Sequence, residues 1–269
     1  MECLVQDVSI YYEEIGEGRP LVMFHGTPVD HHHVAHDMEP LFAARSGWRR
    51  IYPDLPGMGR SPSSGSIGSH ADMVDVMEGF VDAVAPGQRF VVSGVSYGGY
   101  LARWLTHRRA ADLVGFFACV PSFRLGGSGG VPPASVIAPD EGLVASLDED
   151  EALFASAYTV HTPELLAEFR ANYTPAFAKA DYAFLDRLDE SGPPAEPPPM
   201  EVPFPAPSLI LAGRQDSWSG YVDAWAALED YPRATFAVLD RAAHGLTGEQ
   251  RVLFQALVSE WLDRVEEYA

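Results

Sequence analysis

Short apolar runs alternate with stretches of helical periodicity along the first half of the chain. The runs lie at 8–14, 20–24, 50–53, 89–93 and 113–120. Between them, apolar residues recur at helical spacing in 70–85 and 97–109. Largely continuous apolar strands that are separated by helices predict a parallel sheet with helices on both faces.

The last part of the chain returns to the same pattern. Residues 208–212 (SLILA) and 234–239 (ATFAVL) predict two more strands, and residues 249–267 predict an amphipathic helix with a mostly apolar stripe on one side. The chain is therefore expected to begin and end in one core domain, formed by residues 1–120 and 208–269.

Residues 121–207 interrupt this alternation. The segment opens with Pro121 and a glycine-rich loop at 126–130, and it closes with eight prolines between positions 193 and 207. A stretch that dense in proline is stiff and extended and cannot join a sheet. We expect it to be the linker that returns the chain to the core.

Helical periodicity inside this segment lies near 140–158 and 162–190. Large apolar side chains recur through both parts: Phe154, Tyr158, Leu165, Phe169, Tyr173, Phe177 and Phe184. A segment this rich in aromatic residues needs a surface to bury against. The sequence therefore predicts a helical cap at 121–207, inserted between two strands of the core.

Composition and charge narrow the class of protein. The chain has 269 residues, 47% hydrophobic and 21% charged, with a formal net charge of -20. This charge argues against nucleic acid or an anionic membrane as a partner, because both attract basic surfaces. A single lysine, Lys179, against 17 arginines indicates a GC-rich bacterial genome.

The two cysteines, Cys3 and Cys119, are too few for a disulfide framework. Cys119 lies in an apolar run and is expected to be a small buried side chain. The first residues lack the basic and apolar regions of a signal peptide, and no apolar stretch approaches the roughly 20 residues that span a bilayer. We therefore expect a cytoplasmic protein.

Gly94-Val95-Ser96-Tyr97-Gly98-Gly99 carries the clearest chemical signal. It matches G-x-S-x-G, follows the strand at 89–93 and precedes the helix at 97–109. A sharp turn from strand to helix would project the Ser96 hydroxyl above the sheet, and the glycines two residues to either side leave room for that turn. The pattern predicts Ser96 as a nucleophile.

At this motif the chain resembles the α/β-hydrolase superfamily, and two further stretches match in order. Phe24-His25-Gly26-Thr27-Pro28 is similar to the family's oxyanion loop, and Asp54–Ser61 is similar to its D-x-P-G-x-G-x-S turn. The resemblance implies the α/β-hydrolase fold: a mostly parallel central sheet flanked by helices, with an inserted helical cap. It also implies an oxyanion hole built from the backbone N–H groups of Thr27 and Tyr97.

A serine hydroxyl needs a base to become a nucleophile, and His244 is the best placed of nine histidines. It follows the last predicted strand and precedes the last helix, where the family carries its base. Asp216 follows the strand at 208–212, which is the family's usual place for the acid, and Asp240 is the second candidate. The order Ser96, Asp216, His244 is the order that the family shows.

The cluster at 30–37 (Asp-His-His-His-Val-Ala-His-Asp) raises the question of a metal site. No cysteine and no second carboxylate–histidine set lies nearby in the sequence, so the spacing of a zinc site is not met. We expect no metal here, and interpret the cluster as a solvated loop and helix start at the mouth of the pocket.

Together these features predict a carboxylesterase-like serine hydrolase that acts on an ester-like carbonyl of a small apolar or aromatic molecule and needs no cofactor. We expect the substrate pocket to involve His25, Phe123, Phe154, Tyr158 and Trp218. Relatives that open epoxides or remove halogens use an aspartate in place of Ser96. Hydrolysis of a C–C bond in a diketone-like substrate, amide hydrolysis, acyl transfer, and a slow-turnover ligand-binding receptor remain alternatives.

Overall fold

The computed structural model describes residues 1–124, 130–192 and 196–268. Its centre is an eight-stranded sheet in the order β1-β2-β4-β3-β5-β6-β7-β8. The strands are β1 (Glu2–Val5), β2 (Val8–Ile15), β3 (Arg19–Phe24), β4 (Trp48–Pro53), β5 (Phe90–Val95), β6 (Leu113–Cys119), β7 (Ser208–Gly213) and β8 (Ala234–Leu239). All seven predicted strands are confirmed, and β1 was not predicted.

Only the first strands run antiparallel: β1 pairs with β2, and β2 pairs with β4. From β4 to β8 every pairing is parallel. Every residue of β5, β6 and β7 is buried. Because these strands are covered on both faces, they need apolar residues at consecutive positions, which is the pattern that the sequence carries.

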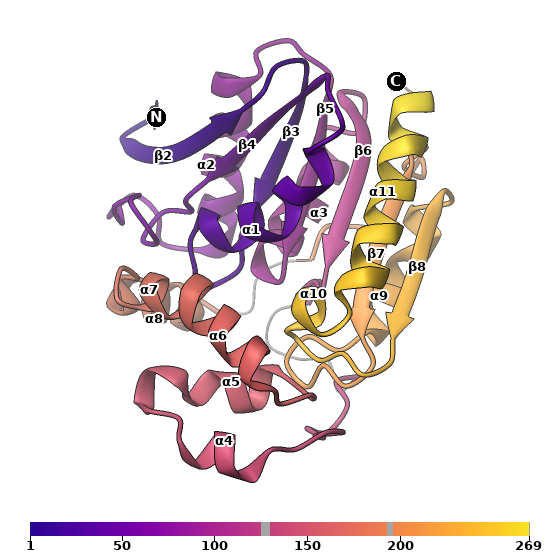
Figure 1. Ribbon diagram of the computed structural model, residues 1–269. Helices are drawn as coiled ribbons and strands as arrows, with labels where there is room; N and C mark the ends of the chain where they lie inside the picture. Colours follow the sequence, from indigo (N-terminus) through magenta and orange to yellow (C-terminus); the bar gives the residue numbers. More distant parts are fainter. Residues whose placement is uncertain (125–129, 193–195, 269) are drawn as a thin grey trace.

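Helices cover both faces of the sheet (Figure 1). On one face, α1 (His31–Phe42) and α11 (Arg251–Tyr268) pack against alternate strand residues such as Leu21, Val91 and Phe117. On the other face lie α2 (His70–Val84), α3 (Tyr97–Arg108) and the short α9 (Val222–Ala226) with η2 (Ala227–Asp230). The predicted fold class is confirmed.

Helices also fill the segment between β6 and β7, beyond the carboxyl ends of the strands (Figure 1). They are α4 (Glu141–Ala145), η1 (Glu149–Glu151), α5 (Ala152–Ala157), α6 (Pro163–Asn172), α7 (Thr174–Phe177) and α8 (Tyr182–Glu190). Most of the predicted glycine-rich loop (125–129) and the first prolines of the return linker (193–195) lie outside the described residues.

The helical segments predicted near 140–158 and 162–190 are present, and each is divided into shorter helices. Helical turns restart wherever a side chain caps a new N-terminus. The side chains of Asp140, Asp148, Thr162 and Asp181 each accept a hydrogen bond from a backbone N–H three residues further on. The described part of the segment is therefore a set of short helices. Among the described residues, no helix combines the length and the hydropathy that a membrane span requires.

Candidate active site

Ser96 occupies the turn between β5 and α3, with φ 53° and ψ -117°. Few residues other than glycine adopt this region, so the turn holds backbone strain. A Cβ atom at position 94 would lie 2.0 Å from the Gly98 carbonyl oxygen, and one at position 98 would lie 2.3 Å from the Phe24 carbonyl oxygen. Glycine is thus required at both positions, for close backbone approach rather than for positive φ.

Backbone hydrogen bonds fix Ser96 against the next strand. Its N–H donates to the Cys119 carbonyl at 3.0 Å, and its carbonyl accepts from the Ser122 N–H at 3.0 Å. The Ser96 Oγ lies 3.4 Å from Ser122 Oγ, which in turn lies 3.0 Å from Ser219 Oγ. A short chain of hydroxyls therefore runs from Ser96 toward the loop that carries Asp216.

Asp216 and His244 meet as the sequence predicts. Because β7 and β8 are parallel neighbours, the loops that follow them leave the same edge of the sheet. His244 Nδ1 lies 3.0 Å from Asp216 Oδ2, with the His244 side chain 14% exposed and the Asp216 side chain fully buried. Such a carboxylate orients the imidazole and leaves Nε2 for chemistry.

The other oxygen of Asp216 is held as well. Oδ1 accepts from the backbone N–H groups of Trp218 at 2.9 Å and Ser219 at 3.1 Å. Burial raises the pKa of the Asp216 carboxyl, but the charge of His244 and the hydrogen bonds from His244, Ser219 and Trp218 outweigh it and hold that pKa below its usual value. The carboxylate is therefore ionised at neutral pH.

Asp240, the second candidate for the acid, points elsewhere. Its Oδ1 accepts from the Gln215 side chain at 2.9 Å, in an exposed position. Three other histidines are also engaged outside this pair. His70 contacts the Tyr97 hydroxyl at 3.0 Å, His107 lies 3.8 Å from Asp230, and His161 lies 3.2 Å from the Tyr158 carbonyl.

Glu249, at the end of α10 (Leu246–Glu249), holds the His244 loop in place. Its Oε2 accepts from the Ala243 N–H at 2.7 Å, and its Oε1 accepts from the N–H groups of Thr159 at 2.6 Å and Val160 at 2.9 Å. Burial raises the pKa of Glu249, although these three donors act in the opposite direction. No sequence signal marks this residue, because its partners are backbone atoms.

His25 orients the predicted oxyanion loop. Its Nε2 accepts from the Leu55 N–H at 2.9 Å, so the ring proton is on Nδ1, which lies 2.7 Å from the Gly26 carbonyl oxygen. Burial lowers the pKa of His25, in keeping with a neutral ring. The Gly26 carbonyl and the Thr27 N–H belong to one planar trans peptide and point in opposite directions. The contact that fixes the carbonyl therefore also fixes the direction of the N–H.

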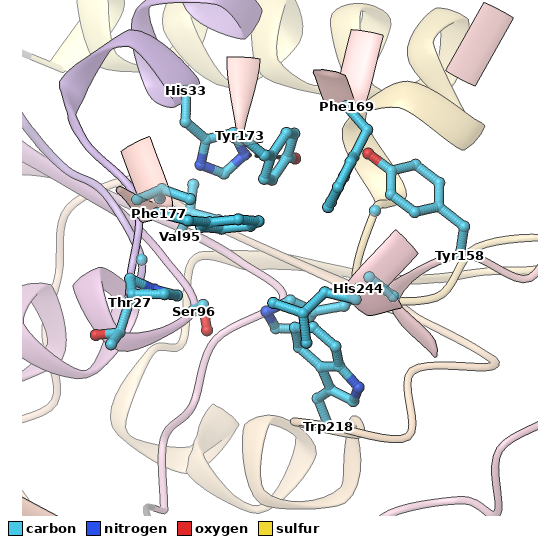
Figure 2. A pocket seen from close by; sticks show the side chains of 16 residues that line it. Thr27, His33, Val95, Ser96, Tyr158, Phe169, Tyr173, Phe177, Trp218 and His244 are labelled. Carbon is cyan, nitrogen blue, oxygen red and sulfur yellow. Dashed lines mark hydrogen bonds between the residues drawn. The ribbon is translucent and has the colours of Figure 1, made fainter. Parts of the chain in front are cut away.

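Ser96, Thr27 and His244 line one cavity of about 50 Å³, shown in Figure 2. Most of its wall is apolar or aromatic and comes from both the core and the inserted helices. The remaining lining residues are Gly26, Pro28, Val29, His33, Val95, Leu153, Ala157, Tyr158, Phe169, Tyr173, Phe177, Trp218 and Gly245. The room suffices for a few water molecules or a small acyl group.

Two of the five residues predicted for the pocket line this cavity. Tyr158 faces it from the inserted segment, and the Trp218 ring lies 4.8 Å from the His244 ring. The other three do not. His25 is buried, and its ring contacts the Gly26 carbonyl and the Leu55 N–H. Phe123 packs with Phe116 in the core, and Phe154 stacks on Tyr158 in the cluster of rings behind the cavity wall.

Two further residues form part of the cavity wall (Figure 2): His33, from the cluster expected at the mouth of the pocket, and Tyr173, from the aromatic residues of the inserted segment. The Tyr173 hydroxyl lies 2.7 Å from His33 Nε2. Burial and the neighbouring histidines lower the pKa of His33 to about 3, so this ring is neutral. The wall of the cavity thus stays uncharged at this point while still offering polar atoms.

The solvated loop predicted for 30–37 is wrong, apart from the predicted helix start. Asp30 caps α1, and Asp30, His31 and His33 are buried while His32 is exposed. The backbone N–H of His31 donates to Asp54 Oδ1 at 2.8 Å, and His31 Nδ1 lies 2.7 Å from the same oxygen. The long-range partner Asp54 removes His31 from solvent, which the local sequence does not reveal.

Known proteins resemble this chain, one of them over nearly its whole length. It is 26% identical to the 2-hydroxy-6-oxononadienedioate/2-hydroxy-6-oxononatrienedioate hydrolase of Burkholderia vietnamiensis (strain G4 / LMG 22486), over 96% of this chain and 92% of that enzyme. It is 29% identical to the AB hydrolase superfamily protein YisY of Bacillus subtilis (strain 168), in a match that spans only 44% of each protein.

Solved structures share the fold. An alpha/beta superfamily hydrolase from Oenococcus oeni PSU-1 has a TM-score of 0.85 at 23% identity over 99% of both chains. The enol-lactonase from Burkholderia xenovorans LB400 has a TM-score of 0.74 at 20% identity over 98% of this chain and 100% of its own. The model of the alpha/beta hydrolase family matches residues 21–256, and the chain therefore belongs to that family.

Proposed function

We propose that the protein is a serine hydrolase that cleaves an ester-like carbonyl compound with a small, uncharged, apolar or aromatic acyl group. Ser96 is the nucleophile, His244 the general base and acid, and Asp216 the carboxylate that orients His244. The N–H groups of Thr27 and Tyr97 form the oxyanion hole. One observation carries the proposal: the strained Ser96 and the Asp216-bound His244 line the same cavity.

The chemistry follows from these positions. His244 Nε2 takes the proton from Ser96 Oγ as that oxygen attacks the carbonyl carbon, and Thr27 and Tyr97 stabilise the resulting oxyanion. His244 then protonates the leaving oxygen, which leaves an acyl group on Ser96. Water, activated by the same imidazole, attacks the acyl carbon and frees the acid. Ionised Asp216 stabilises the imidazolium at both steps.

The cavity supports a small and uncharged acyl group. Its walls are chiefly the rings of Phe169, Tyr173 and Phe177 and the side chain of Val95 (Figure 2). No lysine or arginine is among the described residues that line it, and His33 is neutral. A carboxylate placed here would lose its hydration without gaining a cationic partner, at a cost of several kcal/mol.

We also propose that residues 121–207 act as a cap over a core formed by 1–120 and 208–269. The described part of this segment contains helices and no strand of the sheet, and it supplies Leu153, Ala157, Tyr158, Phe169, Tyr173 and Phe177 to the cavity wall. The cap would therefore choose the acyl group, while the core supplies the chemistry.

Hydrolysis of a C–C bond is the second candidate. The relative from Burkholderia vietnamiensis is named for such a substrate and matches nearly the whole chain. That substrate is a dioate, however, and carries two carboxylates, which the uncharged cavity disfavours. An uncharged diketone-like substrate would fit the same walls.

Labelling with a fluorophosphonate tests the nucleophile. Wild type is expected to become labelled and Ser96→Ala is not, because only an activated serine attacks the phosphorus. The same variant should lower kcat/KM toward p-nitrophenyl acetate by at least about 10⁴-fold. A folded wild type that stays unlabelled would contradict the proposal and favour a receptor. A series of p-nitrophenyl esters then tests size, with activity expected to fall beyond short acyl chains.

A further inference from the structure

A second cluster of polar side chains lies outside the cavity, at the start of α1. His31 there is 1% exposed, and its Nδ1 is held by Asp54 at 2.7 Å. Its other ring nitrogen, Nε2, is buried and has no hydrogen-bond partner among the described residues. A buried, unpaired ring nitrogen is costly, and it therefore calls for a ligand.

Glu13, on β2, faces that nitrogen. Its Oε1 lies 3.4 Å from His31 Nε2 and also accepts from the Tyr11 hydroxyl at 3.3 Å. A tetrahedral zinc ion with bonds of about 2.0 to 2.1 Å sets its ligands about 3.3 to 3.4 Å apart. The separation of these two atoms is therefore that of two zinc ligands.

His32 supplies a third ligand. Glu13, His31 and His32 each offer one ligand atom, and these three atoms lie within 4.8 Å of one another. The His31 and His32 rings are 4.0 Å apart between centroids, and His32 Nδ1 is held by Asp30 at 3.0 Å. A histidine whose Nδ1 contacts a carboxylate presents Nε2 to a metal, and this second contact fixes the ring. His31 and His32 both meet that condition.

From this geometry we propose that Glu13, His31 and His32 bind a divalent transition-metal ion of the zinc type, with water in the fourth position. The ion would join β2 to the first turn of α1, directly after the loop that carries Thr27. None of the three residues lines the Ser96 cavity, so the site is structural and independent of the proposed hydrolysis. The partly exposed Glu13 and His32 side chains leave a path for the ion.

Isothermal titration of the full-length, untagged, chelator-treated protein with Zn²⁺ tests the proposal. Wild type is expected to bind one ion, with a higher Tm when loaded. Glu13→Gln and His32→Gln are each expected to weaken binding by at least tenfold and to remove the shift in Tm. Both changes are made at partly exposed positions, so the variants should fold.

His36→Gln is the matched control. His36 is exposed one helical turn after His32, and the two could chelate an ion on the helix surface alone. The proposal requires His36→Gln to bind like wild type. It is overturned if wild type shows no saturable binding of Zn²⁺. It is equally overturned if His36→Gln abolishes binding while Glu13→Gln does not.

Discussion

The core and the inserted helices build opposite walls of the same cavity by different means. In the core, backbone atoms fix the positions: Ser96 is held by Cys119 and Ser122, and Asp216 by two N–H groups. In the inserted segment, rings hold one another. Phe154 stacks on Tyr158 at 4.6 Å between centroids, and Phe169 stacks on Tyr173 at 5.0 Å.

This difference predicts how each wall responds to change. Backbone-fixed positions allow almost no substitution, because an added atom meets a main chain that cannot move. Ring-packed positions tolerate exchange of one apolar side chain for another of similar volume. The core thus keeps the chemistry constant, while the inserted segment can vary the substrate.

Polar contacts also join the two regions, among them those of Lys179 and Glu249. Lys179, between α7 and α8, lies 2.8 Å from the Asp30 carboxylate that caps α1. Glu249 spans from the His244 loop to Thr159 and Val160. These contacts set how the aromatic wall sits above Ser96.

The largest effect is expected from a change at the core carboxylate. Asp216→Asn keeps the shape but lets an amide face His244, so the imidazole loses its orientation and its countercharge. We expect kcat for p-nitrophenyl acetate to fall by about 10⁴-fold. Asp240→Asn is the control, expected to stay within about threefold of wild type since Asp240 faces Gln215. Equal losses in both would contradict the assignment of the acid.

Glycine substitutions compare the two regions directly. Gly98→Ala places a Cβ 2.3 Å from the Phe24 carbonyl, and should cost more than about 3 kcal/mol or prevent folding. Gly142→Ala, in α4, meets only the Asp140 side chain at 3.5 Å, and should stabilise by about 0.5 to 1 kcal/mol. Thermal and urea unfolding measure both. A tolerated Gly98→Ala would refute the backbone argument.

The Asp30–Lys179 contact should respond to acid. Charge and hydrogen bonds from Lys179 and His32 overcome the effect of burial and lower the pKa of Asp30 to about 2. Because the folded pKa lies below the unfolded value of about 3.9, the carboxylate stabilises the fold at higher pH, by at most about 2.5 kcal/mol. That contribution is lost as the pH falls from about 4 to 2.

Asp30→Asn isolates this effect, since asparagine also caps helices. Urea unfolding at pH 6 should show wild type more stable than the variant, and the difference should vanish near pH 2. A difference that is independent of pH would show that the carboxylate charge is not what joins the regions.

Among the predicted changes in catalysis, the smallest is expected at Glu249. Glu249→Gln replaces one acceptor oxygen by an amide N–H₂, so either Ala243 or the pair Thr159 and Val160 loses its partner. We expect a loss of about 1 to 3 kcal/mol in unfolding free energy and a fall in kcat of several-fold as the His244 loop loosens. The exposed Glu229→Gln should change neither. An unchanged Glu249→Gln would mean that the loop is held by other contacts.

The places of Asp216 and His244 followed from the resemblance to α/β-hydrolases. The sequence by itself determined strands β2 to β8, the two helical layers and the turn that carries Ser96. These features depend on local pattern: consecutive apolar residues in strands that are covered on both faces, glycines at a tight turn, and polar residues just after strand ends. It also determined that the inserted segment would be helical and aromatic, although not where each helix would restart.

Only the tertiary structure decided which side chains meet. The apolar character of Phe123, Phe154 and Tyr158 predicts that all three are buried, but the packing decides that, of these three, Tyr158 lines the cavity. The neighbours of His31 come from distant segments, Glu13 from β2 and Asp54 from the turn after β4, and those of Glu249 are backbone groups. Hydrophobic periodicity specifies that a residue is inside, whereas its partner depends on how distant segments are brought together.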